Sequence, residues 1–193
     1  RLGIGMNENI QAFLQVLDAA DNTTGGGTAS GIAGAMAAGL AGMVARLSVG
    51  KTDRSADYYK SVAEEAQQLS ERLFSGAKED AAAFDEVSKA YKMPKSDDEV
   101  KVKRSAAIQK AMVFAAEVPL SNARLCRRIL DICTDLKKSY NRNAASDLEC
   151  AEYLAGAGLK GCAANVRINL TSIKNEETRR DLENRLESYV KGE

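Results

Sequence analysis

The sequence contains no histidine and no tryptophan, and only two prolines occur among its 193 residues. Histidine is the commonest general base and the commonest zinc ligand, so its absence leaves proton transfer to Asp, Glu, Lys, Tyr or Cys. The scarcity of proline removes the residue that most often interrupts long helices. These absences point to a helical protein whose chemistry, if it has any, uses carboxylates.

The chain also lacks net charge, because 27 basic side chains balance 27 acidic ones. A neutral protein has no general electrostatic attraction to nucleic acid or to an anionic membrane. We therefore expect neither as a partner. An anionic ligand would need a local basic pocket.

No pair of cysteines has the CxxC spacing of a metal or redox motif. Cys126, Cys133, Cys150 and Cys162 are instead interpreted as reduced core residues, which predicts a cytoplasmic protein.

Apolar residues recur at helical spacing along most of the chain, between short turn signals. We predict an all-α, up-and-down bundle of about six to seven helices, formed as a single domain over residues 1–193. Capping boxes of the Ser-x-x-Glu type, at Ser96–Glu99 and Ser146–Glu149, are expected at the N-termini of two of these helices. Pro119 is expected to end one helix and restart the next. The helices are placed near residues 10–21, 28–47, 55–91, 96–115, 123–136, 146–169 and 182–189.

One helix is expected to be long. If residues 55–91 form it without a break at Gly76, it measures about 55 Å at about 1.5 Å per residue. That exceeds a compact monomer of this size, so we expect a homodimer that covers the projecting ends.

Residues 28–49 are rich in glycine and alanine and contain few large side chains. A transmembrane helix is one interpretation of this segment. Arg46 and the amphipathic segments on both sides favour another, in which the segment is a buried central helix. Other helices, or its own copy in a dimer, can then approach it closely.

Asp80 occupies a core position in the stripe of the long helix, between Ala77 and Phe84. Desolvation of a carboxylate at such a position raises its pKa toward the range of a general acid or base. The alternative is a structural ion pair with a Lys or Arg of another helix.

The glycines Gly25, Gly26 and Gly27, followed by Thr28, place unpaired N–H groups at the start of a helix. Such a terminus favours anions. We predict that an anionic group binds here with help from basic side chains, for which the candidates are Arg46, Lys51 and Arg167. A plain turn with Thr28 as the N-cap is the alternative.

Asp147, Asn165 and Asn169 share one stripe of the sixth predicted helix. Asp147 is a further candidate acid. The alternative is a structural role, because acidic side chains are common in the first turn of a helix, where they interact favourably with the helix dipole. Asp147 and Asn165 are about 27 Å apart along one helix, so they cannot meet within one chain.

Several short motifs together carry a resemblance to a known family. They are Gly25–Thr28, Met43–Leu47 with Gly50-Lys51, Asp80 with Phe84-Asp85, Val118-Pro119-Leu120, Asn141–Asp147 and Asn165–Asn169. In this order, the chain resembles the cyclodeaminase domain of formiminotransferase-cyclodeaminase. It is equally similar to the stand-alone methenyltetrahydrofolate cyclohydrolases of that family.

The resemblance implies an all-helical homodimer that binds tetrahydrofolate derivatives near the glycine loop, with no metal and no further cofactor. It implies Asp80 and Asp147 as catalytic residues. The implied substrate-binding residues are Gly25, Gly26, Gly27, Thr28, Arg46, Lys51, Asp85, Asn141, Asn143, Asn165, Arg167 and Asn169.

Three functions remain open. Hydrolysis of methenyltetrahydrofolate to formyltetrahydrofolate is favoured, because these residues include no formiminotransferase part. Cyclodeamination of formiminotetrahydrofolate, with release of ammonia, acts on the same carbon. A non-catalytic helical dimer that binds folate or a protein partner is the third.

Overall fold

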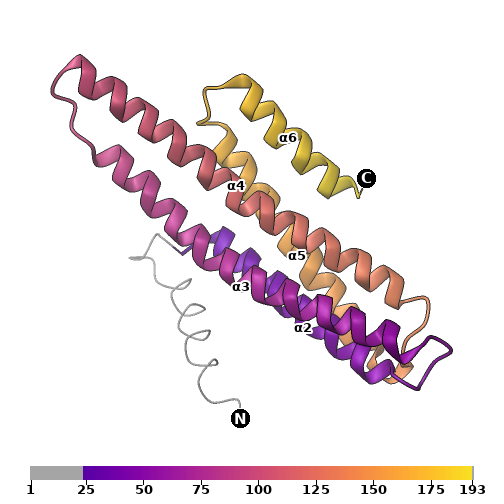
Figure 1. Ribbon diagram of the computed structural model, residues 1–193. Coiled ribbons are helices and arrows are strands. Elements are labelled where there is room, and N and C mark those ends of the chain that lie inside the picture. The colour runs from indigo at the N-terminus through magenta and orange to yellow at the C-terminus, as the bar shows by residue number, and fades with distance from the viewer. Residues whose placement is uncertain (1–23, 193) are drawn as a thin grey trace, which may run out of the picture.

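The computed structural model describes residues 24–192, so the helix expected near residues 10–21 lies outside the described residues. Figure 1 shows α3 (Ala56–Lys92) and α4 (Asp98–Leu136) as a long antiparallel hairpin. Helices α2 (Gly26–Ser48) and α5 (Ala145–Leu170) pack along one half of this hairpin, and α6 (Glu176–Lys191) lies beside α4. The 3-10 turn η1 (Arg142–Ala144) leads into α5. The all-α bundle is thus confirmed for the described part of the chain.

The predicted number of helices was wrong, because the described residues form five α-helices. Pro119 does not divide α4, which continues for 39 residues. A proline removes the hydrogen bond to the carbonyl four residues earlier, here that of Ala115. The side-chain Nδ2 of Asn169 donates to this oxygen at 2.7 Å and compensates for the loss. The bundle therefore has two long helices rather than one, and α3 continues through Gly76 as expected.

Neither predicted capping box forms. Asp97, not Ser96, is the N-cap of α4, and its Oδ1 accepts the backbone N–H of Val100 at 2.9 Å. Ala144 precedes α5 without any side-chain cap, because η1 runs directly into the helix and Arg142 accepts the N–H of Ala145. A backbone carbonyl of the preceding turn thus accepts a hydrogen bond at the start of α5, in place of the Ser146 side chain that was expected to cap this helix.

Helix α2 is the central helix of this half of the bundle, as its small residues predicted, and it packs against α3 and α5. A Cβ at Gly34 would lie 2.7 Å from the Sγ of Cys126, and one at Gly158 of α5 would lie 3.0 Å from the same sulfur. By length and hydropathy α2 could also cross a membrane, but 61% of its most apolar window is buried inside the bundle. Burial of that kind is common in core helices.

Three of the four cysteines are buried, but Cys150 is exposed, so its predicted place in the core was wrong. It lies on the outward face of α5. Burial raises the pKa of the Cys133 thiol to about 12. The contact with Cys126, together with burial, raises the pKa of Cys162. Cys133 and Cys162 therefore stay protonated and cannot act as bases near neutral pH.

Candidate active site

A cavity of about 410 Å³ opens where the first turn of α2 meets α3, α4 and α5. It contains the glycine loop, Asp80 and the two asparagines that the sequence singled out. The lining residues are Gly25, Gly26, Gly27, Asp80, Phe84, Val87, Tyr91, Met112, Ala115, Asn165, Ile168 and Asn169. Four segments that are distant in sequence thus form one site.

Asp80 is half-buried, and its carboxylate lies directly against the backbone of α2. A Cβ at Gly27 would come within 2.3 Å of Asp80 Oδ2 and within 2.4 Å of Oδ1. No side chain fits in that space, so glycine at position 27 permits the approach. The glycine loop therefore has a packing role at the site, and the backbone N–H of Thr28 directly after it bonds the Asp80 carboxylate.

Burial raises the pKa of the Asp80 carboxyl above its ordinary value, and hydrogen bonding from the N–H and hydroxyl of Thr28 partly opposes that shift. Thr28 is itself buried, and its hydroxyl also lies 3.3 Å from the carbonyl oxygen of Ala77. Among residues 24–192 no Lys or Arg forms an ion pair with Asp80. The ion-pair alternative thus has no partner in the described bundle, and the carboxylate is available to a ligand.

Both cavity asparagines use their amide N–H groups to bond helix carbonyls. Asn165 Nδ2 donates to the Gly161 carbonyl at 2.9 Å, and Asn169 Nδ2 donates to that of Ala115. These bonds fix the two side chains at the cavity wall. Their amide oxygens are then left as acceptors for a ligand.

The outer part of the cavity is apolar. Phe84, Tyr91 and Ile168 are 43%, 50% and 65% exposed, which is high for large apolar side chains. Phe84 and Tyr91 continue the stripe that begins in the core at Leu73, so the core stripe of α3 becomes a cavity wall beyond Asp80. A wall of this kind suits a flat aromatic ligand.

Five predicted site residues lie at the opposite end of α2. They are Arg46, Lys51, Asn141, Asn143 and Asp147. The side chain of Asn141 donates to the Leu47 carbonyl at 3.0 Å, and its backbone N–H donates to Ser48 Oγ at 2.9 Å, so the two segments meet. Twenty residues of helix separate Gly26 from Arg46, or about 30 Å. Within one chain the structure does not bring this group to Asp80.

Two further predicted residues also lie away from the cavity lining. Asp85 is exposed on α3, one position beyond Phe84. Arg167 is exposed on α5, where it pairs with Glu187 at 3.1 Å. Both stay predictions as ligand contacts.

A basic hollow of about 590 Å³ adjoins the cavity and shares Tyr91 with it. Its cations are Arg104, Lys174 and Arg179, which come from α4, the α5–α6 connection and α6. Arg104 Nη2 donates to the Tyr91 carbonyl at 2.8 Å, and the guanidinium lies 5.7 Å from the centre of the Tyr91 ring. Sequence reasoning missed this hollow, because nothing in three separate segments predicts that their cations converge.

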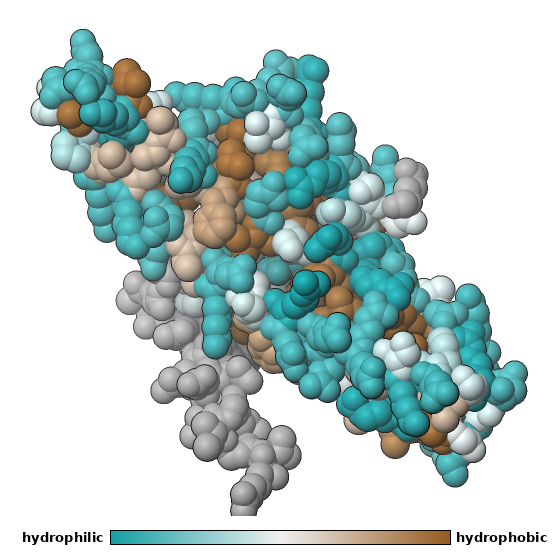
Figure 2. Space-filling model, in the orientation of Figure 1, coloured by the Kyte–Doolittle hydropathy of each residue, from teal (hydrophilic) through white to brown (hydrophobic). Residues whose placement is uncertain are grey.

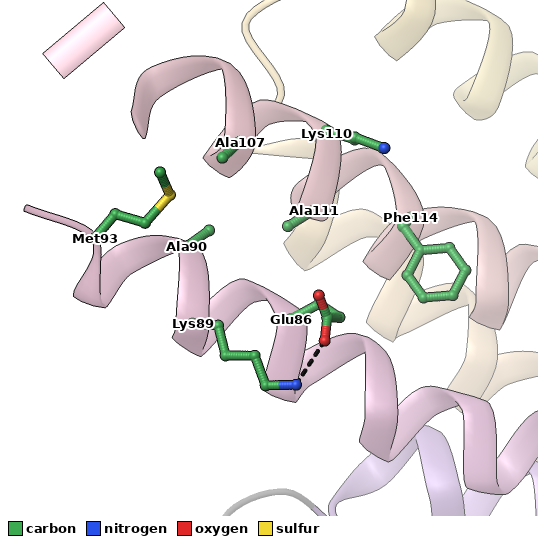
Figure 3. Close-up of a pocket in the computed structure, with 8 residues that line it drawn as sticks. All are labelled: Glu86, Lys89, Ala90, Met93, Ala107, Lys110, Ala111 and Phe114. Carbon is green, nitrogen blue, oxygen red and sulfur yellow. Dashed lines mark hydrogen bonds and ion pairs between the residues drawn. The ribbon is translucent and has the colours of Figure 1, made fainter. Parts of the chain in front are cut away.

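Another hollow, of about 330 Å³, lies between α3 and α4, and Ala90 and Ala111 are among the residues that line it (Figure 3). Its polar lining consists of Lys110 and the ion pair of Lys89 with Glu86 at 2.7 Å. In the space-filling view, apolar side chains gather over the middle of α4 and are ringed by hydrophilic ones (Figure 2). This hollow contains no buried carboxylate, so it is a weaker candidate for chemistry than the Asp80 cavity.

Among the described residues, no group of three His, Cys, Asp or Glu side chains is placed to hold a metal ion. The groups available for chemistry in the cavity are thus a carboxylate and amides. They suit binding of a cation and activation of water.

Comparisons with known proteins agree on one family. A family model described as formiminotransferase-cyclodeaminase matches residues 9–188. Methenyltetrahydrofolate cyclohydrolase of Methylorubrum extorquens is 39% identical over 184 residues, which cover 92% of this chain and 88% of that protein. Formimidoyltransferase-cyclodeaminase of Rattus norvegicus is 27% identical over 96% of this chain but only 35% of its own length. A crystal structure of formiminotetrahydrofolate cyclodeaminase from Thermotoga maritima superposes with a TM-score of 0.78 at 31% identity, over 88% of this chain and 83% of that one.

Proposed function

The chain belongs to the formiminotransferase-cyclodeaminase family, and we propose that it is a folate one-carbon enzyme that hydrolyses methenyltetrahydrofolate to formyltetrahydrofolate. The similarity to the cyclohydrolase covers nearly the whole of both proteins, whereas the chain spans about a third of the rat bifunctional relative. The observation that carries the proposal is the half-buried Asp80 carboxylate, without a cationic partner in the described bundle, in a cavity with an apolar wall.

The reaction needs a group that both attracts a cation and takes a proton. Methenyltetrahydrofolate carries positive charge over two nitrogens and the carbon between them. Asp80 holds this cation and accepts a proton from the water whose oxygen bonds to that carbon. The added oxygen then forms the double bond of the formyl group while the bond from the carbon to one nitrogen breaks. The departing nitrogen takes a proton from a second acid, the remaining proton on the oxygen passes to the conjugate base of that acid, and Asp80 releases its proton to solvent. The product keeps the formyl group on the other nitrogen.

The cavity and the basic hollow together match a ligand that is cationic at one end and anionic at the other. Asp80 and Tyr91 are eleven residues apart on α3, or about 16 Å. With the reacting carbon at Asp80, the aromatic ring of the folate lies along Phe84 and Tyr91. Its glutamate carboxylates then reach the cations Arg104, Lys174 and Arg179.

No cofactor beyond the folate substrate is proposed, because water adds to a carbon that is already cationic. We propose a homodimer as the working form and the cytoplasm as its compartment. Support for the compartment comes from four free cysteines with no disulfide, three of them buried.

Cyclodeamination is the second candidate, favoured by the likeness to the Thermotoga structure. In that reaction the second of the two bridging folate nitrogens attacks the formimino carbon and ammonia leaves, and Asp80 again faces a cationic centre.

One paired assay separates the candidates. The purified chain is given methenyltetrahydrofolate while the methenyl absorbance is followed, and formiminotetrahydrofolate while ammonia is measured. We expect loss of the absorbance well above the uncatalysed rate, without ammonia release. Ammonia release alone would replace the cyclohydrolase by the cyclodeaminase, and inactivity in both assays would leave a non-catalytic folate-binding or partner-binding protein.

A further inference from the structure

The first turn of α2 receives no cap from its own segment. Its N-cap is Gly25, which has no side chain to accept a hydrogen bond, and no acidic residue occurs in the first turn. The first hydrogen bond of the helix runs from the Ala29 N–H to the Gly25 carbonyl at 3.0 Å. The N–H groups of Gly26, Gly27 and Thr28 therefore have no partner within the helix. Thr28 is the third residue of α2, so the alternative in which it is the N-cap was wrong.

The Asp80 carboxylate takes the place of the missing cap. It lies against this turn and accepts hydrogen bonds from both the backbone N–H and the hydroxyl of Thr28. The N–H of the third helical residue is one that an N-cap side chain ordinarily binds. A carboxylate at this end of a helix also interacts favourably with the helix dipole. Helix α3 thus supplies the cap that α2 lacks, and the same side chain lines the cavity.

The Thr28 hydroxyl has one hydrogen and two acceptors. Its Oγ1 lies 3.3 Å from the Ala77 carbonyl oxygen and also bonds the Asp80 carboxylate. Because α3 is continuous here, the Ala77 carbonyl already accepts the N–H four residues later and does not depend on Thr28. A hydrogen bond to an ionised carboxylate is roughly twice as strong as one between neutral groups. The hydroxyl therefore donates to Asp80 while the carboxylate is charged, and this preference is lost when Asp80 is protonated.

We propose that Thr28 is a positioning residue for the reaction, which holds the charged Asp80 carboxylate before proton transfer and turns its hydroxyl to the Ala77 carbonyl once Asp80 carries the proton. Thr28 is buried and is not among the residues that line the cavity, so its hydroxyl acts on a ligand only through Asp80. The proton that Asp80 gains comes from the attacking water, and the Thr28 hydroxyl keeps its own proton throughout. This assignment rests on the proposed function for the reaction that it serves.

Few other groups are placed to set the charge of Asp80. Among the described residues that line the cavity, the only other titratable side chain is that of Tyr91, further along α3. From α5, Cys162 faces Asp80, and its contact with Cys126 of α4, together with burial, raises the pKa of the Cys162 thiol, which stays neutral near pH 7. The only charged residue of α2 is Arg46, about 30 Å away along the helix. Hydrogen bonds from the first turn of α2 are thus what favours the ionised carboxylate.

The test is the pH dependence of turnover in Thr28→Val, which keeps the branched shape of the side chain but lacks the hydroxyl. One of the two bonds that favour the charged carboxylate is then lost, so the pH of half-maximal rate should rise by about one unit. Below that pH the rate should be about tenfold lower than in the wild type, and at high pH it should approach the wild-type rate. Thr28→Ser keeps a hydroxyl and should restore the wild-type profile. Thr28→Ala repeats the test if the valine variant does not fold.

Ser70→Ala is the matched control. Ser70 Oγ donates to the Ala35 carbonyl at 2.9 Å, so a hydroxyl again joins α3 to α2, but within residues 24–192 it bonds no carboxylate. This variant should leave the pH profile in place. A general loss of rate in Thr28→Val with an unmoved profile would overturn the proposal, and so would an equal shift of the profile in Thr28→Ser.

A second measurement needs no substrate. The carboxyl carbon NMR signal of Asp80 is identified in the full chain by its absence from Asp80→Asn, and its titration midpoint is measured in each variant. The midpoint should be about one unit higher in Thr28→Val than in the wild type, and unchanged in Thr28→Ser and Ser70→Ala. If the midpoint moves in this way but the wild-type protein is inactive on both folates, the bond between Thr28 and Asp80 stands and the proposed function fails. An unmoved midpoint in an active enzyme would overturn the role of Thr28.

Discussion

The side-chain amide of Asn169 donates to the carbonyl of Ala115 at 2.7 Å, and this is the carbonyl that Pro119 leaves without its helical donor. The bond joins α4 to α5 and fixes an amide at the wall of the Asp80 cavity. A break in the backbone hydrogen bonding of one helix is thus used to position a side chain of another.

The first prediction follows from this bond. Asn169→Leu should destabilise the protein by roughly 1–3 kcal/mol, because the buried Ala115 carbonyl loses its donor. With Pro119→Ala also present, the alanine N–H can bond Ala115, so Asn169→Leu should then cost less. Denaturant unfolding of the wild type, both single variants and the double variant measures the coupling. If the free-energy changes of the two single variants simply add in the double variant, the predicted coupling between Asn169 and Pro119 is absent.

The second prediction concerns Asp80→Asn, which keeps the shape of the side chain but cannot take a proton. The chemical step should slow by roughly a hundredfold or more, with the bundle still folded. The rate in the wild type should fall as the pH is lowered through the raised pKa of this carboxyl, because only the ionised form acts as a base. Unchanged turnover in the variant would remove Asp80 from the chemistry.

The same variant should change stability in a direction set by the sign of the pKa shift. A carboxyl whose pKa is raised by folding contributes most stability below its unfolded value, and that contribution is lost as the pH rises through the folded value. Asp80→Asn removes this loss, so the denaturant midpoint near pH 7 should exceed that of the wild type. Near pH 3, the two midpoints should converge. A lowered midpoint at pH 7 would instead reveal a cationic partner for Asp80.

The third prediction compares two glycines of α2, one inside the cavity and one outside it. Gly27→Ala places a methyl carbon 2.3 Å from the present position of Asp80 Oδ2, which is too close for two non-bonded atoms, so the carboxylate must move. Turnover should fall by at least about tenfold, the usual scale of a misplaced catalytic group. Gly39→Ala, on the same helix but outside the cavity lining, meets no atom within 4 Å and serves as the matched control. Equal rates for the two variants would show that Asp80 does not need its present position.

The fourth prediction tests the basic hollow. Arg179→Glu should raise KM for the folate by about tenfold or more with little change in kcat, because the glutamate carboxylates meet a negative charge. Arg180→Glu makes the same charge change at the next position, where Arg180 pairs with Glu176 outside the hollow. KM values that rise equally in both variants would indicate a general charge effect rather than a subsite.

The helices could be predicted because apolar residues at helical spacing form a pattern within each segment of the sequence. Asp80 could be singled out because it is a charged residue at an apolar position of such a pattern. The continuity of α4 could not be read, since the group that compensates for Pro119 is fifty residues further along, at Asn169. The convergence of Arg104 with Arg179 depends on the path of the α5–α6 connection, which leaves no local pattern. The resemblance supplied a set of site residues but not their division between the two ends of α2.

The composition of α2 also bears on the order in which the molecule folds. Glycines at 26, 27, 31, 34, 39 and 42 make this helix unstable by itself, because each costs up to about 1 kcal/mol of helix propensity. The α3–α4 hairpin has a short connection, and its two helices contain a single glycine, Gly76, so their higher helix propensity favours early formation. Helix α2 then becomes ordered against a surface that already exists, and substitutions in it should change the unfolding rate more than the folding rate. We therefore expect the Asp80 cavity, whose edge is the first turn of α2, to be the last part of the described bundle to assemble.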